Sequence, residues 1–429
     1  MTYQETVEYL FSLLPAYHRV GKPAYKGNLD NTLELDRYFS HPHSRFRSVH
    51  VAGTNGKGSV SHMTASVLQE AGYRTGLYTS PHLKDFRERI RIDGEMIPEE
   101  EVVRFVADHD GIIGKMKPSF FELTVALAFD YFARMKVDIA VVEVGMGGRL
   151  DSTNIITPLL SVITNIGHDH MEFLGPTLKA VAGEKAGIIK EGVPVVIGET
   201  QPETRDVFLQ RAEAMHAPVT FADSRFRCRL GRIFPDSSMR RFTLSGPDDG
   251  MTLKGETPLG GLAQRKNLQT TAAAVEKLSA DLGLSREHFL RGVAGVVENT
   301  GLMGRWQILS RSPLTVCDTG HNREGLEYVM RQVRAAEKEN LHMVIGFVND
   351  KDLGSVLPLF PRDARYYFTR ASVPRALDEN LLKAEAGRYG LNGETFHSVP
   401  VAVDAARTAA GPRDMIFIGG STFVVADAL

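Results

Sequence analysis

The chain has 429 residues, of which 43% are hydrophobic, so it can bury more than one apolar core and we expect two or three domains. Its 50 basic and 52 acidic residues nearly balance, which argues against nucleic acid or an anionic membrane as a partner. The two cysteines, Cys228 and Cys317, make no disulfide framework, and no uncharged apolar run reaches the roughly 18 residues of a membrane span, so we expect a soluble cytoplasmic protein.

Short β-branched runs alternate along the chain with stretches that have apolar residues at helical spacing. The predicted strands lie at 49–52, 138–144, 159–165, 193–198, 314–318, 342–347, 366–369 and 415–419. The predicted helices lie at 59–71, 121–136, 179–190 and 267–282. This alternation is typical of α/β folds with parallel sheets and crossover helices.

Two segments break the alternation. Residues 221–261 are rich in Arg, Asp, Gly and Pro and carry a turn signal at 247–250, which predicts a β-rich excursion. Residues 299–304 read Asn-Thr-Gly-Leu-Met-Gly and predict a hinge. We therefore expect a large α/β domain over 1–298 and a smaller α/β domain over 305–429, joined by the hinge.

A glycine-rich loop follows the first predicted strand and opens a helix, which is the context of a phosphate-binding loop. In the sequence HVAGTNGKGS, residues 50–59, the glycines let backbone N–H groups approach phosphate oxygens. Lys57 can neutralise β- and γ-phosphate charge, and Ser59 can reach Mg²⁺. Gly58 departs from the general pattern, which has a hydroxyl residue after the lysine. The alternative is an ordinary Gly-rich turn with a solvated lysine.

Polar residues follow other predicted strands. Glu143 lies near the end of a strand, where a carboxylate can hold Mg²⁺, although a salt-bridged core glutamate is the alternative. His170 follows the next strand and is a candidate ligand of a second Mg²⁺, whereas we read His168 as structural. Ser80 follows another short strand and can approach that ion, or can form a plain turn.

The order and spacing of several motifs resemble the folylpolyglutamate synthase/dihydrofolate synthase family of the Mur ligase superfamily, over about residues 27 to 421. These motifs are HVAGTNGKGS, TSPHL with ERIRI behind it, FFELTVALAF, EVGMGGRLDSTN, TNIGHDHMEFLG, EKAGIIK, GRWQI, DTGHN and a terminal GGS. The resemblance implies a P-loop ATPase domain and a C-terminal Rossmann-like domain. Two departures are Asp318-Thr-Gly-His321-Asn322, where the family has another small-residue pattern, and Met303 in place of a common proline.

The resemblance also implies which residues bind ligands. The implied ATP contacts are Asn55, Gly56, Lys57, Gly58, Ser59, Asn267, Arg305 and Asp318. The implied metal contacts are Ser59, Ser80, Glu143, His170 and Lys185. The implied contacts to the pterin substrate are Ser119, Phe120, Phe121, Glu122, Leu150, Asp151 and Ser152, and those to glutamate are His321 and Ser421. As alternatives, the two phenylalanines belong to the core, residues 151–154 form a self-contained turn, and His321 is an ordinary loop histidine.

The resemblance implies an ATP-dependent acid–amino-acid ligase. ATP phosphorylates a folate-type carboxylate, on dihydropteroate or a tetrahydrofolate polyglutamate, and the amine of L-glutamate then attacks the acyl phosphate. The implied catalytic residues are Lys57, His170, Lys185 and Arg305, with two Mg²⁺ ions. We expect closure about the hinge to insert Arg305, whose alternative is a surface arginine beside Trp306.

Lys185, in the EKAGIIK motif, is implied by the family to be a carbamoylated lysine that binds the second metal ion, with Lys190 as an ordinary surface residue. A solvated helix lysine is the alternative. Two rival functions are a Mur-type peptidoglycan precursor ligase and a nucleotide-dependent switch. We expect a monomer, and the sequence leaves open whether both folate substrates are accepted.

Overall fold

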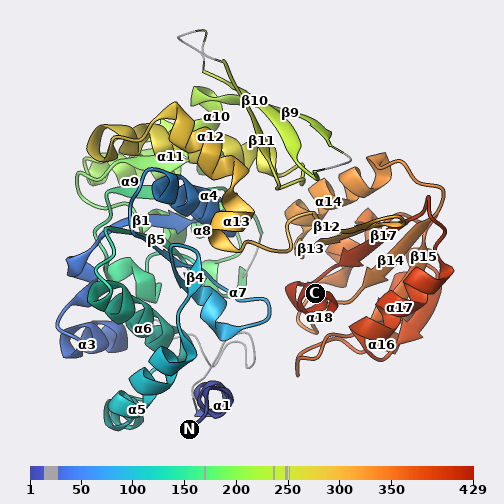
Figure 1. Cartoon of the computed structure of the whole chain (residues 1–429), viewed down its shortest axis with the longest axis horizontal. Coiled ribbons are helices and arrows are strands. Elements are labelled where there is room, and N and C mark those ends of the chain that lie inside the picture. Colours follow the sequence, from blue (N-terminus) through green and yellow to red (C-terminus); the bar gives the residue numbers. More distant parts are fainter. Residues whose placement is uncertain (14–27, 169–170, 235–236, 247–249, 251) are drawn as a thin grey trace. The chain divides into compact units, whose positions relative to one another are not determined.

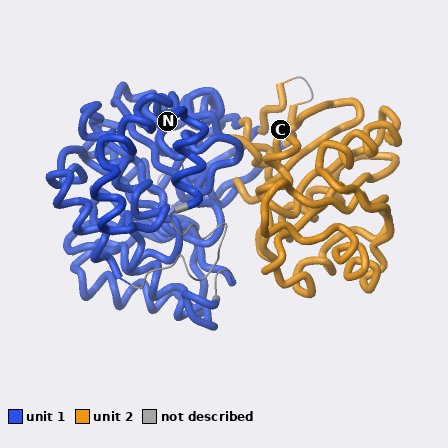
Figure 2. The backbone as a smooth tube through the Cα atoms, turned by 90° about the horizontal axis from the view of Figure 1, so that it is seen from below, with its two compact units in different colours: residues 1–231, 241–257, 265–302 blue, residues 232–240, 258–264, 303–429 orange. Residues whose placement is uncertain are grey.

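The computed structural model describes residues 1–13, 28–168, 171–234, 237–246, 250 and 252–429 (Figure 1). The chain divides into two compact units, which Figure 2 colours separately. Unit 1 comprises residues 1–231, 241–257 and 265–302, and unit 2 comprises residues 232–240, 258–264 and 303–429. Each unit contains its own α/β sheet.

Unit 1 is built on an eight-stranded sheet with the order β4-β3-β2-β5-β1-β6-β7-β8. Its strands are β1 Arg47–Ala52, β2 Thr75–Tyr78, β3 Ile90–Ile92, β4 Glu95–Met96, β5 Ile139–Glu143, β6 Leu160–Ile163, β7 Val195–Ile197 and β8 Val219–Phe221. Six neighbouring strands of this sheet, β2, β5, β1, β6, β7 and β8, are parallel to one another. Strands β3 and β4 add an antiparallel edge beside β2. Strand β1 is central because β5 and β6 pair with it on either side.

Helices cover this sheet and bury its apolar residues. The unit 1 helices are α1 Tyr3–Leu13, α3 Asp30–Tyr38, η2 Pro42–Arg45, α4 Lys57–Glu70, η3 Phe86–Arg89, α5 Glu99–Met116, α6 Phe120–Arg134, η4 Ser152–Ile155, α7 Met171–Leu174, α8 Leu178–Ala186, α9 Pro202–Ala214, α10 Ala222–Arg225, α11 Gln264–Leu282, α12 Arg286–Ala294 and α13 Val296–Thr300. One core joins α5 and α6 to β2 and β5, and another joins α8 and α9 to β6 and β7. Helix α4 packs against β1, β2 and β5.

The predicted β-rich excursion is confirmed as a three-stranded sheet of β9 Arg227–Ile233, β10 Arg240–Ser245 and β11 Thr252–Thr257. The turn predicted at 247–250 lies mostly outside the described residues. The predicted helix at 179–190 is shorter than expected, because α8 ends at Ala186 and Gly187 follows as its C-cap.

Unit 2 is a mixed six-stranded sheet with the order β12-β13-β17-β14-β15-β16. Its strands are β12 Gln307–Arg311, β13 Leu314–Asp318, β14 Leu341–Ile345, β15 Arg365–Thr369, β16 Gly393–Phe396 and β17 Met415–Gly419, and only the β12–β13 pairing is antiparallel. Its helices are α14 Arg323–Ala335, α15 Leu353–Val356, η5 Leu357–Leu359, α16 Glu379–Gly387, α17 Val399–Ala409 and α18 Thr422–Ala428.

Alternate residues of the unit 2 strands belong to two different cores, as the period of two in a strand requires. Met343 and Phe417 pack in the core that contains α14 and α16, whereas Val344 and Ile418 pack in the core that contains α17 and α18. Helices therefore cover both faces of the sheet. The predicted fold class, a mostly parallel α/β domain with a smaller α/β domain, is confirmed. Across the described ranges, every helix is too short or too polar to cross a membrane.

Candidate functional site

Three adjacent strands of unit 1 bring the predicted phosphate loop and acid to one edge of the sheet. Val51 of β1 pairs with Glu143 of β5, and Ala52 pairs with Ile163 of β6. The loop that begins at Gly53 therefore leaves the sheet between the ends of β5 and β6. The carboxyl ends of parallel strands, next to the central strand, are where α/β proteins bind ligands.

The phosphate loop runs from β1 into α4. The Lys57 ammonium donates to the carbonyl oxygens of Gly53, at 3.0 Å, and Thr54, at 3.2 Å. Gly56 has a left-handed φ of 88°, and a Cβ atom there would lie 2.3 Å from Oδ1 of Asn267. Asn267, from α11, therefore lies directly against the loop, and Ser59 is buried in the first turn of α4.

Residues after β6 hold the phosphate loop in place. The Thr54 N–H donates to the Asn165 carbonyl at 2.9 Å, and the Asn55 N–H donates to Asn165 Oδ1 at 2.8 Å. The Thr164 hydroxyl donates to the Asn55 carbonyl at 2.6 Å. The sequence reasoning missed this role for Thr164 and Asn165. Only part of the signal was available: a Thr-Asn pair directly after a parallel strand lies at the same sheet edge as the loop, but the sequence does not show that its strand is next to β1.

Three of the predicted metal-binding residues of unit 1, Ser59, Ser80 and Glu143, have side chains with oxygen atoms that suit a hard cation. Glu143 is buried, and one of its carboxylate oxygens accepts from the Ser80 N–H at 3.4 Å. The carboxylate of Glu143 and the hydroxyl of Ser59 are the kind of donor that Mg²⁺ prefers, so these residues fit the predicted ion. His170 lies outside the described residues, and His168 is exposed.

Lys185 approaches the same loop from α8. Its side chain is 4% exposed, and its Nζ donates to the Gly53 carbonyl at 2.9 Å. A Cβ atom at Gly148 would lie 2.8 Å from the Glu184 carbonyl oxygen and 3.1 Å from Lys185 Cα. The glycine therefore lets the segment after β5 pack directly on α8. The prediction of Lys190 as an ordinary surface residue is wrong, because this residue is half-buried. Its Nζ donates to the Asn154 carbonyl at 2.8 Å, and burial lowers the pKa of its ammonium.

The predicted pterin-binding segment begins helix α6. The Ser119 hydroxyl accepts from the Glu122 N–H at 3.2 Å, and the Glu122 carboxylate accepts from the Ser119 N–H at 2.5 Å, so the two residues form a capping box. Phe120 is a core residue that stacks on Phe11 with ring centroids 4.7 Å apart. Phe121 instead faces the loop after β5, because a Cβ at Gly145 would lie 2.4 Å from its ring.

Asp151 organises the same loop through a buried hydrogen-bond network. Its Oδ2 accepts from the Met146 N–H at 2.9 Å, and its Oδ1 accepts from the Thr153 N–H at 3.0 Å and hydroxyl at 2.5 Å. The Thr153 hydroxyl also contacts His50 Nε2 at 2.8 Å. Burial raises the pKa of Asp151, and burial, with Lys190 as a lesser cause, lowers the pKa of His50 to about 3.

Two further predicted pterin contacts flank Asp151. Leu150 is half-buried and Ser152 is buried. The short helix η4 begins at Ser152 with Asp151 as its N-cap.

The predicted residues of unit 2 gather where β13 and β17 end. Both carboxylate oxygens of Asp318 accept backbone N–H groups, from Trp306 at 2.8 Å and Gly320 at 2.8 Å, and burial raises its pKa. Arg305 donates to the Gly304 carbonyl at 3.3 Å and to the Thr319 hydroxyl.

Two other residues of this edge were predicted to bind glutamate. His321 Nδ1 lies 3.1 Å from the Thr319 carbonyl. Asp318 pairs with Gly419 of β17, so Ser421 follows at the same edge, where its hydroxyl caps α18 by accepting from the Phe423 N–H at 3.0 Å.

Family models match both parts of the chain. The Mur ligase middle domain matches residues 51–275, and the Mur ligase glutamate ligase domain matches residues 304–422. The dihydrofolate synthase/folylpolyglutamate synthase of Bacillus subtilis is 33% identical and covers 94% of both chains. A probable bifunctional folylpolyglutamate synthase/dihydropteroate synthase of Haloferax volcanii is also 33% identical over the whole chain, but this chain spans only half the length of that relative.

Solved structures resemble the whole chain. E. coli FolC in complex with DHPP and ADP has a TM-score of 0.86 and 28% identity, and the match covers 100% of this chain and 97% of that one. A bifunctional folylpolyglutamate synthase/dihydrofolate synthase with Mn, AMPPNP and L-glutamate bound has a TM-score of 0.83 and 25% identity, with the same coverage.

Proposed function

This chain belongs to the folylpolyglutamate synthase/dihydrofolate synthase branch of the Mur ligase family, and from that premise we propose how its residues add glutamate to folates with ATP. The reaction joins the amine of L-glutamate to a folate-type carboxylate through an acyl phosphate. The observation that carries the proposal is the convergence of the phosphate loop, Glu143 and Lys185 at one edge of the unit 1 sheet.

The phosphate loop binds and aligns the triphosphate. The N–H groups at Gly56 to Ser59 donate to phosphate oxygens at the start of α4, and the Lys57 ammonium neutralises their charge. Asn55, whose own N–H is held by Asn165, is a further ATP contact at the start of this loop. Asn267 contacts the nucleotide from α11, which its position against Gly56 supports. Phosphoryl transfer needs charge neutralisation and alignment rather than a protein nucleophile, and these residues supply part of both.

Ser59 and Glu143 would hold the first divalent cation, and His170 with Lys185 would hold the second, which Ser80 would also approach. A bound divalent cation supplies charge stabilisation where negative charge develops between the γ-phosphate and the carboxylate. One similar solved structure contains Mn with AMPPNP and another is a complex with AMPPCP, which supports the presence of a divalent cation and a triphosphate in this reaction.

We propose that Lys185 carries a carbamate. The neutral amine of Lys185 attacks CO₂, an N–C bond forms, one proton leaves, and the side chain becomes an anionic oxygen ligand. Two observations support this chemistry: Lys185 is buried, and its Nζ lies on the phosphate loop rather than in solvent. A plain ammonium there would repel the second cation, whereas a carbamate would bind it.

The proposed substrate-binding residues come from both units. Phe121, Leu150, Asp151 and Ser152 bind the pterin beside the loop after β5, with Ser119, Phe120 and Glu122 shaping the first turn of α6. In unit 2, Arg305 and Asp318 contact ATP, and His321 and Ser421 hold the incoming glutamate. Residues 299–304 serve as the hinge between a domain over 1–298 and one over 305–429, so that closure brings Arg305 to the triphosphate.

One assay tests the function. Release of ADP is measured with ATP, Mg²⁺ and L-glutamate, and with dihydropteroate, a reduced folate or a UDP-muramoyl compound as acceptor. We expect stimulation by the folate-type acceptors and strict dependence on glutamate. Stimulation by the UDP-muramoyl compound alone would indicate a peptidoglycan precursor ligase, and release without any acceptor would indicate a switch.

We also propose a cytoplasmic monomer. Cys228 and Cys317 are both buried and are not joined by a disulfide, which suits a reducing compartment. A molar mass near 47.3 kDa in light scattering would support the monomer, and twice that value would contradict it.

A further inference from the structure

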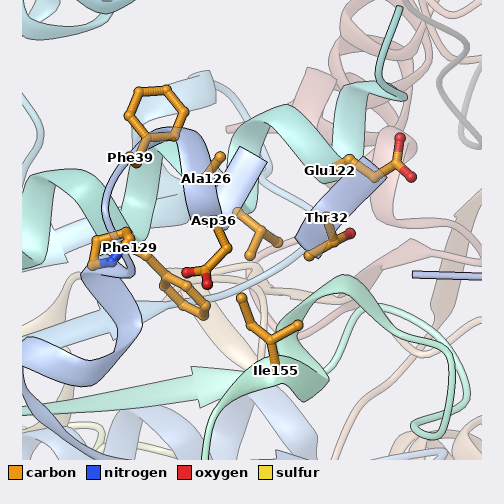
Figure 3. Close-up of a pocket in the computed structure, with 9 residues that line it drawn as sticks. Thr32, Asp36, Phe39, Glu122, Ala126, Phe129 and Ile155 are labelled. Carbon is orange, nitrogen blue, oxygen red and sulfur yellow. The ribbon is translucent and has the colours of Figure 1, made fainter. Parts of the chain in front are cut away.

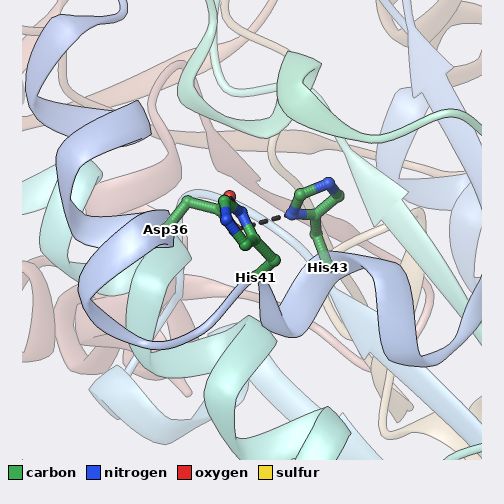
Figure 4. A group of neighbouring side chains, drawn as sticks. All are labelled: Asp36, His41 and His43. Atoms are coloured by element: carbon green, nitrogen blue, oxygen red, sulfur yellow. Dashed lines mark hydrogen bonds and ion pairs between the residues drawn. The ribbon is translucent and has the colours of Figure 1, made fainter.

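A cluster of two histidines and an acid lies outside the sheet-edge site. Asp36 comes from α3, His43 comes from η2, and His41 precedes η2 (Figure 4). Nδ1 of His41 lies 2.6 Å from one carboxylate oxygen of Asp36, and Nδ1 of His43 lies 2.6 Å from the other. One ligand atom from each residue can therefore be chosen so that all three lie within 4.8 Å of one another.

The carboxylate at the centre of this cluster is buried. The Asp36 side chain is 5% exposed, whereas His43 is 22% and His41 57% exposed. Asp36 also lines a cavity between α3, α6 and η4 whose other walls include Phe39, Phe129 and Ile155 (Figure 3). A charged carboxylate beside apolar walls requires compensation, and two imidazoles at one carboxylate provide it.

The backbone holds both histidines in position. Ser40 and His41 both have left-handed φ values, 57° and 54°, which are unfavourable for residues that carry a side chain. Several hydrogen bonds maintain this turn: the His41 N–H donates to the Asp36 carbonyl at 2.8 Å, and the Ser44 hydroxyl donates to the His41 carbonyl at 2.7 Å. The turn brings His41 back to Asp36 near the C-terminal end of α3, so the three potential ligands already lie together, and an ion would take the place of the two hydrogen bonds.

We propose that Asp36, His41 and His43 bind a borderline divalent transition-metal ion, with Zn²⁺ as the preferred ion. Two imidazole nitrogens and one carboxylate oxygen form a donor set that suits Zn²⁺ rather than Mg²⁺, and water completes four-coordination on the exposed side. Each 2.6 Å N–O contact holds a proton between the two atoms. When Nδ1 binds the ion, a neutral ring shifts its proton from Nδ1 to Nε2, and a charged ring releases its Nδ1 proton and keeps the one on Nε2.

This site is separate from the catalytic one. Helix η2 leads into β1 at its first residue, Arg47, and the phosphate loop leaves the strand after Ala52. Six residues of extended chain span about 20 Å, so a metal ion at the histidines does not touch the triphosphate. The ion instead fixes the connection between α3 and the central strand, so it stabilises unit 1 without entering the reaction.

The test uses the untagged full-length protein, stripped of metal by a chelator that is then removed, in the absence of ATP. We expect equilibrium dialysis with Zn²⁺ to give one bound ion per chain, and Co²⁺ to give visible d–d absorption. A hundredfold excess of Zn²⁺ over its Kd should raise Tm by roughly 5 to 10 °C. His41→Gln and His43→Gln each weaken Zn²⁺ binding at least about tenfold, and the double variant abolishes it.

The matched control is His216→Gln, which removes an exposed histidine that contacts a single acid, Glu191, at 2.8 Å. This variant should bind Zn²⁺ like the wild type. All the histidine variants should keep their Mg²⁺-dependent ligase activity. Zn²⁺ binding is measured without turnover, so failure of the proposed ligase function would not affect this test. Equal Zn²⁺ binding by the wild type and the double variant, or no binding by either, would overturn the proposal and leave Asp36 as the partner of two ordinary ion pairs.

Discussion

The two proposed halves of the ligase site are assembled in different ways. In unit 1, Lys57, Glu143, Lys185 and Asn267 come from four separate elements, and the sheet brings them together. In unit 2, most of the proposed residues belong to the stretch from Arg305 to His321, and hydrogen bonds to Asp318 and Thr319 join its two ends. The first arrangement depends on tertiary packing, whereas the second is mostly local. Substitutions in unit 1 should therefore affect folding stability as well as ligand binding, whereas substitutions in unit 2 should mainly affect kcat or KM.

The largest expected effect is in unit 2. Arg305→Ala should lower kcat by about 10³ at saturating ATP, because a guanidinium placed on a transferring phosphoryl group stabilises its charge. Arg305→Lys should recover only part of this, since an ammonium lacks the two-pronged geometry. Turnover is measured as glutamate-dependent ADP release, with the exposed Arg311→Ala as control. An Arg305→Ala enzyme with normal kcat would remove Arg305 from the catalytic residues.

The corresponding substitution in unit 1 is Lys185→Ala. It should lower ligase turnover by about 10² to 10³ while ATP binding changes little, because the loss of a carbamate removes a ligand from the second cation and leaves the phosphate loop intact. Short carboxylates should restore part of the activity. Incubation with ¹³CO₂ should give a carbamate NMR signal in the wild type that Lys185→Ala lacks. Lys179→Ala, an exposed lysine of the same helix, is the control. Wild-type turnover of Lys185→Ala would refute the carbamate.

A third substitution tests the packing between elements of unit 1. Gly56→Ala should weaken ATP binding about tenfold, because the new Cβ would lie 2.3 Å from Asn267 Oδ1 and φ is left-handed there. The same clash should also lower the folding stability of Gly56→Ala. The double variant Gly56→Ala/Asn267→Ala removes the clash and should recover part of that stability, which a double-mutant cycle measures by thermal unfolding. Strict additivity of the two substitutions would mean that the Gly56–Asn267 contact carries no coupling energy.

A smaller effect is expected at His321. His321→Ala should raise KM for glutamate roughly five- to tenfold, as expected for the loss of one charge-assisted hydrogen bond to the amino acid, with little change in KM for ATP. His397→Ala removes an exposed histidine of the same unit and should leave both constants unchanged. A His321→Ala enzyme with a normal glutamate KM would identify His321 as an ordinary loop residue.

The sequence predicted those features that follow from strand order along the chain. A Gly-rich loop after one strand and an acid at the end of another had to lie at one sheet edge, and Gly53 and Glu143 do. The position of β1 between β5 and β6 could not be read from the chain, because pairing order is a tertiary property. The anchoring role of Asn165 was missed for that reason. The position of Asn267 against the loop was implied only by family resemblance, since no local pattern links α11 to Gly56.

The smallest effect concerns a residue with both a structural contact and a proposed ligand contact. The Ser119 hydroxyl accepts from the Glu122 N–H and begins α6, whose first turn carries Phe121. Ser119→Ala should lower the free energy of unfolding by about 1 kcal/mol, a Tm decrease of roughly 2 to 4 °C, because the cap is lost. Fraying of that turn should also raise KM for the folate acceptor about two- to threefold by displacing Phe121.

Ser119→Asn distinguishes the two roles of this residue. Asparagine caps a helix as well as serine does, so we expect it to restore Tm. If Ser119 acts only by holding Phe121, the folate KM should return with the stability, as for the residues of unit 1 that act through packing. If Tm returns while KM stays high, the hydroxyl itself contacts the substrate, and Ser119 then behaves like the directly binding residues proposed in unit 2. An unchanged Tm in Ser119→Ala would contradict the contribution of the cap, because the capping contact is the physical basis of the expected loss.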